Sequence, residues 1–301
     1  MNRLQVDVIV IGSGIAGMSA AKLAAEKGLS TTSIEPGLFG GLVLNINKLD
    51  GMPNDEIESG YRLAARMKLQ NGKLGVTTVA QTVTGLVADG DAIVVKTKEA
   101  KHRARKVIIA SGAQLKVLDV KGEIEFLNRG VSRCADCDGP LFRGQDVAVV
   151  GGGDSAVQAA LTLSEGCAKV YIIHRRGELR ARTHLVQALA AKANVELIFD
   201  SLVDHIQGDD VVTAITVRGA GDDKTRDIAC TGVFAYIGLK PNNSFVPAQV
   251  LRDEHGYLIV DDQRRTAMPG IFAIGAVRAG FGGQLIDAFA DASAVVDTLD
   301  A

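Results

Sequence analysis

The 301-residue sequence lacks tryptophan altogether and has only four cysteines, six prolines and 4% aromatic residues. Four cysteines are too few for the disulfide framework of a small secreted domain. With 47% apolar and 23% charged residues, the chain does not have the composition of a disordered protein. Its 33 basic residues nearly balance the 35 acidic ones, so we expect no nucleic-acid partner and no anionic membrane surface. The length favours two globular domains.

The N-terminus also lacks the long apolar run that a membrane span requires. Residues 6–12 read VDVIVIG, an apolar stretch that is interrupted by Asp7 and followed at once by a glycine-rich loop. Such a stretch is too short to cross a bilayer, and we interpret it as a buried first strand rather than a secretion signal. The expected location is therefore the cytoplasm, a reducing compartment in which paired cysteines serve catalysis or metal binding.

Glycine is abundant, with 34 residues, and one cluster has the spacing of a dinucleotide-binding loop. The first strand runs into GSGIAG and then into an alanine-rich segment of helical periodicity that ends at Gly28. Gly12 would form the tight turn, Gly14 would let a pyrophosphate approach the backbone, and Gly17 would allow close helix packing. The next strand, TTSIE, ends at Glu35, where an acid would bind a ribose hydroxyl. The alternative is an ordinary glycine turn with a surface glutamate.

A second cluster repeats this pattern from residue 146. The segment DVAVVGGGDSAVQAALTLSEG again reads strand, glycine turn and helix, with Gly151, Gly153 and Ala156 at the fingerprint positions. Basic residues follow the next strand, where the first unit has its acid: His174, Arg175, Arg176 and Arg180. Guanidinium groups bind a 2′-phosphate through charge-assisted hydrogen bonds, whereas an acid would repel it. This unit predicts NADP(H) rather than NAD(H); the alternative is a solvated basic helix start.

The remaining pattern predicts an α/β protein in which the second unit is inserted within the first. A buried strand at 106–113 and meander strands around 78–90 and 92–100 precede the insertion, and an apolar strand at 232–242 follows it. The tail after residue 270 predicts a final strand, a glycine-rich loop and a helix. We therefore expect one discontinuous domain, residues 1–113 with 242–301, and one inserted domain, residues 114–241.

The stretch SRCADCDGPLF places Cys134 and Cys137 two residues apart. A structural zinc site needs about four ligands, but Cys167 and Cys230 are single and the five histidines are scattered, so we predict no metal. Those two single cysteines adjoin apolar strands and are expected to be buried in the core. A redox role suits the pair, because a thiolate can attack or be attacked at a disulfide. Asp138 could then deliver a proton to the departing sulfur, the alternative being an ordinary Asp-Gly turn.

Taken together, these motifs resemble the low-molecular-weight thioredoxin reductase family over essentially the whole chain. The matching segments are GSGIAG, the glycine pair at 40–41, ASGA, CADCDG, GGGDSA, HRRGELRA, GLKPN and PGIFAIG. The resemblance implies two Rossmann-like dinucleotide-binding domains of the three-layer ββα type, with FAD on the first, NADPH on the inserted one, and a homodimer. It also implies that Cys137 faces the flavin, that Cys134 exchanges with thioredoxin or a related dithiol protein, and that Asp138 is the acid.

The resemblance assigns cofactor contacts residue by residue. The FAD contacts that it implies are Gly12, Gly14, Gly17, Glu35, Gly40, Gly41, Gly112, Gly275 and Gln284. The NADPH contacts that it implies are Gly151, Gly153, Asp154, Ser155, His174, Arg175, Arg176 and Arg180.

The sequence departs from the family pattern in the flavin half. Ala276 stands where the family has an acid that binds the ribityl chain, and Gly283 replaces the arginine of an Arg-Gln pair. Loss of one charged hydrogen bond would weaken flavin binding by roughly 1.5 to 3 kcal/mol. Two alternatives to a protein-disulfide reductase stay open: an enzyme acting on a small-molecule dithiol, and a nucleotide-binding sensor with an altered flavin site. A ferredoxin reductase of the same architecture is disfavoured, because it would not need the cysteine pair. The flavoprotein subunit of alkyl hydroperoxide reductase is a weaker match, because it lacks the basic cluster.

Overall fold

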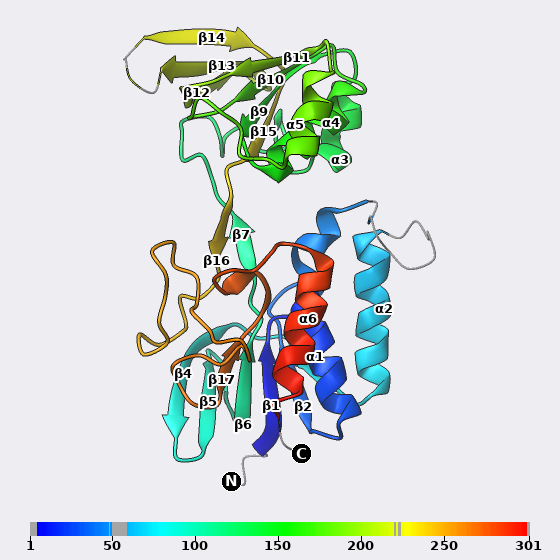
Figure 1. The fold of residues 1–301 in the computed structure, drawn as a ribbon, viewed down its shortest axis with the longest axis vertical. Coiled ribbons are helices and arrows are strands. Elements are labelled where there is room, and N and C mark those ends of the chain that lie inside the picture. The colour runs from blue at the N-terminus through cyan, green and yellow to red at the C-terminus, as the bar shows by residue number, and fades with distance from the viewer. Residues whose placement is uncertain (1–4, 48, 50–58, 220, 222–223, 300–301) are drawn as a thin grey trace. The chain divides into compact units, whose positions relative to one another are not determined.

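The computed structural model describes residues 5–47, 49, 59–219, 221 and 224–299. The chain divides into two compact units, Met1–Gln114 with Lys240–Ala301, and Leu115–Leu239 (Figure 1). It passes between them through β7 (Ala113–Leu115) and β16 (Leu239–Pro241), which pair as a two-stranded sheet. Within the described residues, no helix combines the length and apolarity needed to cross a membrane.

The first unit is built on a seven-stranded sheet of order β3-β2-β1-β6-β5-β4, with β17 also paired to β6. Five of its strands are parallel, namely β1 (Gln5–Ile11), β2 (Thr31–Ile34), β3 (Thr77–Val79), β6 (Lys101–Ile109) and β17 (Ile271–Ala273). The other two, β4 (Val83–Asp89) and β5 (Ala92–Thr97), are antiparallel. The parallel strands place their carboxyl ends, and the loops that follow them, at one edge of the sheet.

Alternate residues of β1 face opposite sides of this sheet, and each side has its own core. Val8 and Val10 pack under the helices α1 (Ile15–Glu26), α2 (Gly60–Lys73) and α6 (Leu285–Val296), which lie together on one face in Figure 1. The alanine-rich face of α1 is fully buried, because small side chains allow helix and sheet to approach closely. Ile9 and Ile11 face the other core, with residues of β4, β5 and the segment 246–258.

The second unit repeats this plan with a parallel five-stranded sheet of order β11-β10-β9-β15-β8. Its strands are β8 (Val131–Ser132), β9 (Asp146–Gly151), β10 (Lys169–Ile173), β11 (Val195–Ile198) and β15 (Gly232–Tyr236). On one face lie the helical segments α3 (Ala135–Asp138), η3 (Gly139–Phe142), α4 (Asp154–Ser164) and α5 (Thr183–Ala190). On the other lies an antiparallel sheet of β12 (Ser201–Gly208), β13 (Val212–Gly219) and β14 (Thr225–Ala229) (Figure 1).

The expected α/β class with two dinucleotide-binding folds is confirmed by this architecture. The two strand-glycine-helix units predicted from residues 6 and 146 form β1 with α1 and β9 with α4. Two short 3-10 helices, η1 (Gly41–Asn45) and η4 (Gly275–Val277), flank the first glycine loop. The strands β12, β13 and β14 were not located individually from the sequence.

Candidate redox site and dinucleotide loops

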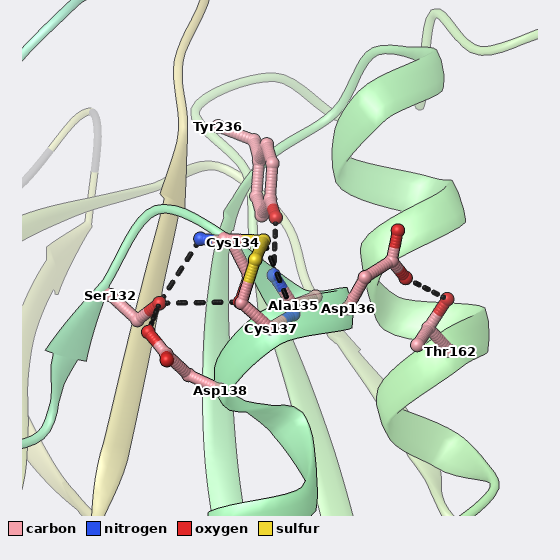
Figure 2. Close-up of a disulfide and its surroundings, with 8 residues drawn as sticks. All are labelled: Ser132, Cys134, Ala135, Asp136, Cys137, Asp138, Thr162 and Tyr236. Carbon is pink, nitrogen blue, oxygen red and sulfur yellow. Dashed lines mark hydrogen bonds between the residues drawn. A yellow bond between two sulfur atoms is a disulfide. The ribbon is translucent and has the colours of Figure 1, made fainter. Parts of the chain in front are cut away.

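Cys134 and Cys137 form a disulfide, with their Cα atoms 5.3 Å apart (Figure 2). Cys134 is the N-cap residue of the short helix α3, and the backbone N–H of Cys137 donates to Cys134 Sγ at 3.2 Å. Cys137 is exposed and Cys134 half-buried. An N–H aimed at a sulfur stabilises negative charge on it, so the contact favours Cys134 as the thiolate once the bond opens.

Ser132 links this disulfide to Asp138. The buried Ser132 hydroxyl donates to Asp138 Oδ2 at 2.6 Å and accepts from the N–H of Cys134 at 3.0 Å. The backbone N–H of Asp138 donates to the carbonyl of Cys134 at 3.0 Å. The carboxyl group named as the candidate acid is therefore held beside the cysteine pair (Figure 2). The sequence reasoning did not single out Ser132, although its place two residues before Cys134 was a usable signal.

Tyr236 was also missed, because it lies 101 residues from its partner. Its hydroxyl accepts from the N–H of Ala135 at 2.8 Å and so fixes the first residue of α3 to the end of β15 (Figure 2). Burial raises the pKa of Tyr236, and the charges of Asp136 and Asp138 act in the same direction, against the hydrogen bond from Ala135. The phenol therefore stays neutral and keeps its proton over the physiological range.

The glycine loop of the second unit adjoins the same tyrosine. A Cβ on Gly151 would overlap the Tyr236 carbonyl oxygen, and a Cβ on Gly152 would overlap the His174 ring. The backbone N–H of Arg180 donates to the carbonyl of Gly152 at 2.7 Å. The basic segment predicted to bind a 2′-phosphate thus lies against the glycine loop, as the topology of β9, α4 and β10 requires.

His174 and the three arginines beside it form a site that is suited to an anionic dinucleotide. His174 is 4% exposed, and its Nε2 has no hydrogen-bond partner among the described residues. Burial lowers the pKa of His174, and the charges of Arg180, Arg176 and Arg175 lower it further. These arginines are exposed, and their guanidinium groups form no ion pair with a described carboxylate. A neutral imidazole and three uncommitted cations suit the phosphate end of NADPH. Gly153 is the N-cap of α4 and Ser155 is exposed in its first turn.

In the first unit, the glycine loop and the residue that ends β2 are joined by hydrogen bonds. Glu35 Oε2 accepts from the N–H of Ser13 at 2.9 Å, and Oε1 accepts from the N–H of Gly37 at 3.0 Å. A Cβ on Gly12, where φ is +105°, would overlap the Ala110 carbonyl oxygen, and one on Gly17 would overlap the carbonyl of Gly12. Only glycine fits this turn, which brings α1 directly onto the sheet.

Three of the other expected flavin contacts, Gly40, Gly41 and Gly275, lie against this loop or the start of α1. The N–H of Gly40 donates to the Ser13 carbonyl at 2.7 Å, and Gly41 and Gly275 pack against the start of α1, at Gly14 and Ala16. Gly112 has open space on its Cβ side. Gln284 is exposed at the N-cap of α6, where its backbone N–H donates to Asp287 Oδ2 at 2.9 Å. All nine FAD contacts stay predictions.

The arrangement at Gly14 is compatible with a bound flavin dinucleotide. Gly14 is the N-cap of α1 and brings no side-chain cap, and a Cβ there would have only the Gly40 carbonyl oxygen within 4 Å, at 3.9 Å. The helix start is therefore open to a pyrophosphate, with Glu35 positioned for a ribose. The Ala276 side chain has no group that could form a hydrogen bond with a ribityl chain, so the fit of the first unit to FAD rests on the glycine loop and Glu35.

Beside Ala276 lies a buried acid that sequence reasoning did not identify. Asp291 on α6 is 1% exposed; its Oδ2 accepts from the N–H of Gly275 at 2.8 Å and from Arg278 Nε at 2.7 Å. Its Oδ1 accepts from Arg278 and from Arg264 Nε, both at 2.7 Å. Burial alone would raise the pKa of Asp291, but the hydrogen bonds from Arg278, Gly275 and Arg264 outweigh it and lower the pKa. This network fixes the backbone of the loop that follows β17.

The two single cysteines lie outside this chemistry. Cys167 and Cys230 are buried and unpaired, as expected from the sequence. Burial, with a contribution from Asp146, raises the pKa of Cys230 to about 12 and also raises that of Cys167. Both therefore remain neutral thiols. Within the described residues, no group of three or more His, Cys, Asp or Glu side chains could hold a metal ion.

Comparison with known proteins agrees with this geometry. Residues 6–293 match the pyridine nucleotide-disulphide oxidoreductase family. The chain is 36% identical to the thioredoxin reductase of Treponema pallidum, over 97% of this chain and 98% of that protein. It is 35% identical to the thioredoxin reductase of Bacillus subtilis, over 95% and 91% respectively. The crystal structure of the Lactococcus lactis thioredoxin reductase superposes with a TM-score of 0.89 at 36% identity, covering 97% of each chain.

Proposed function

The chain belongs to the pyridine nucleotide-disulphide oxidoreductase family, and from this we propose that it uses NADPH to reduce thioredoxin or a related dithiol protein. The observation that carries the proposal is the Cys134–Cys137 disulfide, placed with its candidate acid in the same unit as the basic dinucleotide loop. The relatives at 32–37% identity over nearly their whole length are named thioredoxin reductase, which supports the same substrate here.

The enzyme is an FAD- and NADPH-dependent disulfide oxidoreductase. Bound at the two glycine loops, these cofactors supply the two-electron hydride chemistry of the reaction. Glu35 and the open start of α1 would hold FAD; the α4 start, His174 and the exposed arginines would hold NADPH. We assign residues 1–113 with 242–301 to FAD and residues 114–241 to NADPH and the cysteine pair.

The cysteines carry the disulfide exchange. Two electrons and one proton convert the Cys134–Cys137 disulfide into one thiolate and one thiol. We infer that Asp138 would pass that proton to Cys134, the departing sulfur, take it back when Cys134 attacks, and finally give it to a released substrate sulfur. The Cys134 thiolate then attacks the substrate disulfide, forming a mixed disulfide and releasing a substrate thiolate. Cys137 attacks Cys134 Sγ, which restores the internal disulfide and releases the second thiol. The N–H of Cys137 that points at Cys134 Sγ supports this order.

We further propose that the protein works in the cytoplasm as a homodimer, without a nucleic-acid or membrane partner. The near balance of 33 basic and 35 acidic residues supports the absence of a polyanionic partner. A cysteine pair that cycles between dithiol and disulfide is suited to a reducing compartment.

A direct test follows the colour of the purified protein. We expect a yellow flavoprotein whose visible absorption bleaches on anaerobic addition of NADPH and returns on addition of oxidised thioredoxin. If NADPH is oxidised steadily with small disulfides but not with thioredoxin, the substrate is a small-molecule disulfide and not a protein. A colourless protein that neither binds flavin nor oxidises NADPH would contradict the reductase function and favour a sensor.

The basic loop predicts which nicotinamide cofactor is used. Replacing Arg175 and Arg176 together by glutamine removes two guanidinium groups from the proposed 2′-phosphate site. Because each charged hydrogen bond contributes roughly 1.5 to 3 kcal/mol, the KM for NADPH should rise about 10²-fold or more while the KM for NADH hardly changes. Steady-state kinetics with both cofactors measure this. Arg226→Gln is the matched control, since Arg226 is exposed on β14 in the same unit; equal effects on NADPH and NADH would refute the assignment.

A further inference from the structure

An acidic residue lies at the start of the helix where the second unit is proposed to receive pyrophosphate. Asp154 is the first residue of α4, directly after the N-cap Gly153, which provides no side-chain cap. A carboxylate in the first turn stabilises a helix, but it repels an incoming phosphate group. Binding of the pyrophosphate therefore requires a group that neutralises the Asp154 carboxylate.

In the structure, Arg182 is the group that pairs with the Asp154 carboxylate. Its backbone N–H donates to Asp154 Oδ1 at 2.8 Å, and its Nε donates to Asp154 Oδ2 at 2.6 Å. Both carboxylate oxygens are thus engaged by one residue, and the carboxylate is drawn toward the loop that precedes α5. Arg182 is the N-cap residue of α5, so this pair connects the starts of the two helices.

The same loop contacts the glycine turn at a second point. The N–H of Arg180 donates to the carbonyl of Gly152 at 2.7 Å. Under Gly152 lies the ring of His174, which is 4% exposed and has an Nε2 without a hydrogen-bond partner among the described residues. A buried, unpartnered polar atom beneath the turn is an independent sign that a polar ligand completes this site.

We propose that Arg182 is a positioning residue for the dinucleotide, which acts by neutralising Asp154 and holding its carboxylate away from the pyrophosphate. The proposal rests on NADPH binding at this loop. It assigns two different roles to the arginines of this basic segment. Arg175, Arg176 and Arg180 would recognise the 2′-phosphate, whereas Arg182 would act on a part of the cofactor that NADP⁺ and NAD⁺ share.

This pair contributes little to folding by itself. The Arg182 and Asp154 side chains are 50% and 37% exposed, and exposed ion pairs have small effects on stability. Variants at either position should therefore fold, and a change in their dissociation constants can be attributed to binding and not to loss of folded protein. An uncompensated carboxylate a few ångströms from a phosphate is expected to change affinity by about five- to tenfold.

The test is a double-mutant cycle on the full-length protein, with dissociation constants for NADP⁺ and NAD⁺ measured by calorimetry. Arg182→Gln should weaken the binding of both ligands by about five- to tenfold. Because the proposal makes Asp154 a source of repulsion and not the direct NADPH contact that the resemblance implied, Asp154→Asn alone should leave both dissociation constants unchanged or lower them. The double variant Asp154→Asn with Arg182→Gln should return to within about twofold of the wild type. Arg182→Lys, which keeps the charge, should retain most of the affinity. Arg175→Gln should weaken NADP⁺ alone.

Three results would overturn the inference. The first is unchanged binding in Arg182→Gln, and the second is a loss for NADP⁺ but not NAD⁺, which would make Arg182 a 2′-phosphate ligand. The third is failure of Asp154→Asn to restore binding, which would show a purely structural role. If Arg182→Gln does not fold, Arg182→Met, which keeps the aliphatic stem and removes the charge, takes its place in the cycle. Failure of the wild type to bind either ligand would instead reject NADPH binding itself, and the inference with it.

Discussion

Replacing Cys137 by serine should reduce NADPH-dependent reduction of thioredoxin by about 10³-fold or more. The reason is that the variant has no internal disulfide to accept two electrons, and no second thiol to release the substrate from a mixed disulfide. Cys134→Ser should lower turnover equally, because it removes the attacking sulfur. Steady-state NADPH oxidation measures both variants. Cys167→Ala is the matched control, since Cys167 is buried and unpaired.

The two cysteine variants also test the order of attack. With a single-cysteine thioredoxin activated as a mixed disulfide, Cys137→Ser should form a stable covalent adduct through Cys134, detected by mass spectrometry. Cys134→Ser should form much less. The opposite result would exchange the roles of the two sulfurs, and full turnover in Cys137→Ser would remove the pair from the mechanism.

The second large effect is expected at Asp291 in the first unit. Asp291→Ala leaves the guanidinium of Arg278, which is 9% exposed, without its buried partner. Removing one member of a buried ion pair typically costs 3 to 5 kcal/mol, because the remaining charge is unsolvated. We expect a loss of about that size in the free energy of unfolding, measured by urea denaturation, with a smaller loss in Asp291→Asn. Asp297→Ala, exposed at the end of the same helix, should change stability by less than about 0.5 kcal/mol.

Asp291 also predicts a pH dependence. Because the pKa of Asp291 is lower in the folded state than its ordinary value of 3.8, the folded state favours the ionised form. The stability from this group is complete above pH 3.8 and is lost as the pH falls through the lowered folded pKa. Urea midpoints measured between pH 5 and the acid limit should therefore fall less steeply in Asp291→Asn than in the wild type. Parallel curves for the two proteins would show that Asp291 does not titrate in this way.

In the first unit, which is proposed to bind FAD, the sequence motifs did not predict the hydrogen bonds that the structure shows. Ala276 stands where the family resemblance implies an acid for the ribityl chain. The nearby acid, Asp291, is hydrogen-bonded to Gly275, Arg278 and Arg264. Gln284 was expected to contact FAD because of its place in a motif. The same place is also the N-cap of α6, where the backbone N–H of Gln284 donates to Asp287 Oδ2 at 2.9 Å. A motif states which residue is present but not whether that residue contacts a ligand or begins a helix.

The sequence by itself determined the α/β class, the two strand-glycine-helix units and the cysteine pair. These features depend on backbone conformations that only glycine adopts readily, on hydrophobic periodicity and on short spacings, all of which are local. Only the tertiary structure decided which side chains support them, because the partners lie far apart in the chain. Tyr236 meets Ala135 across 101 residues, Arg182 meets Asp154 across 28, and Arg264 meets Asp291 across 27. Strand order and helix packing bring such pairs together, and no short segment of sequence contains that information.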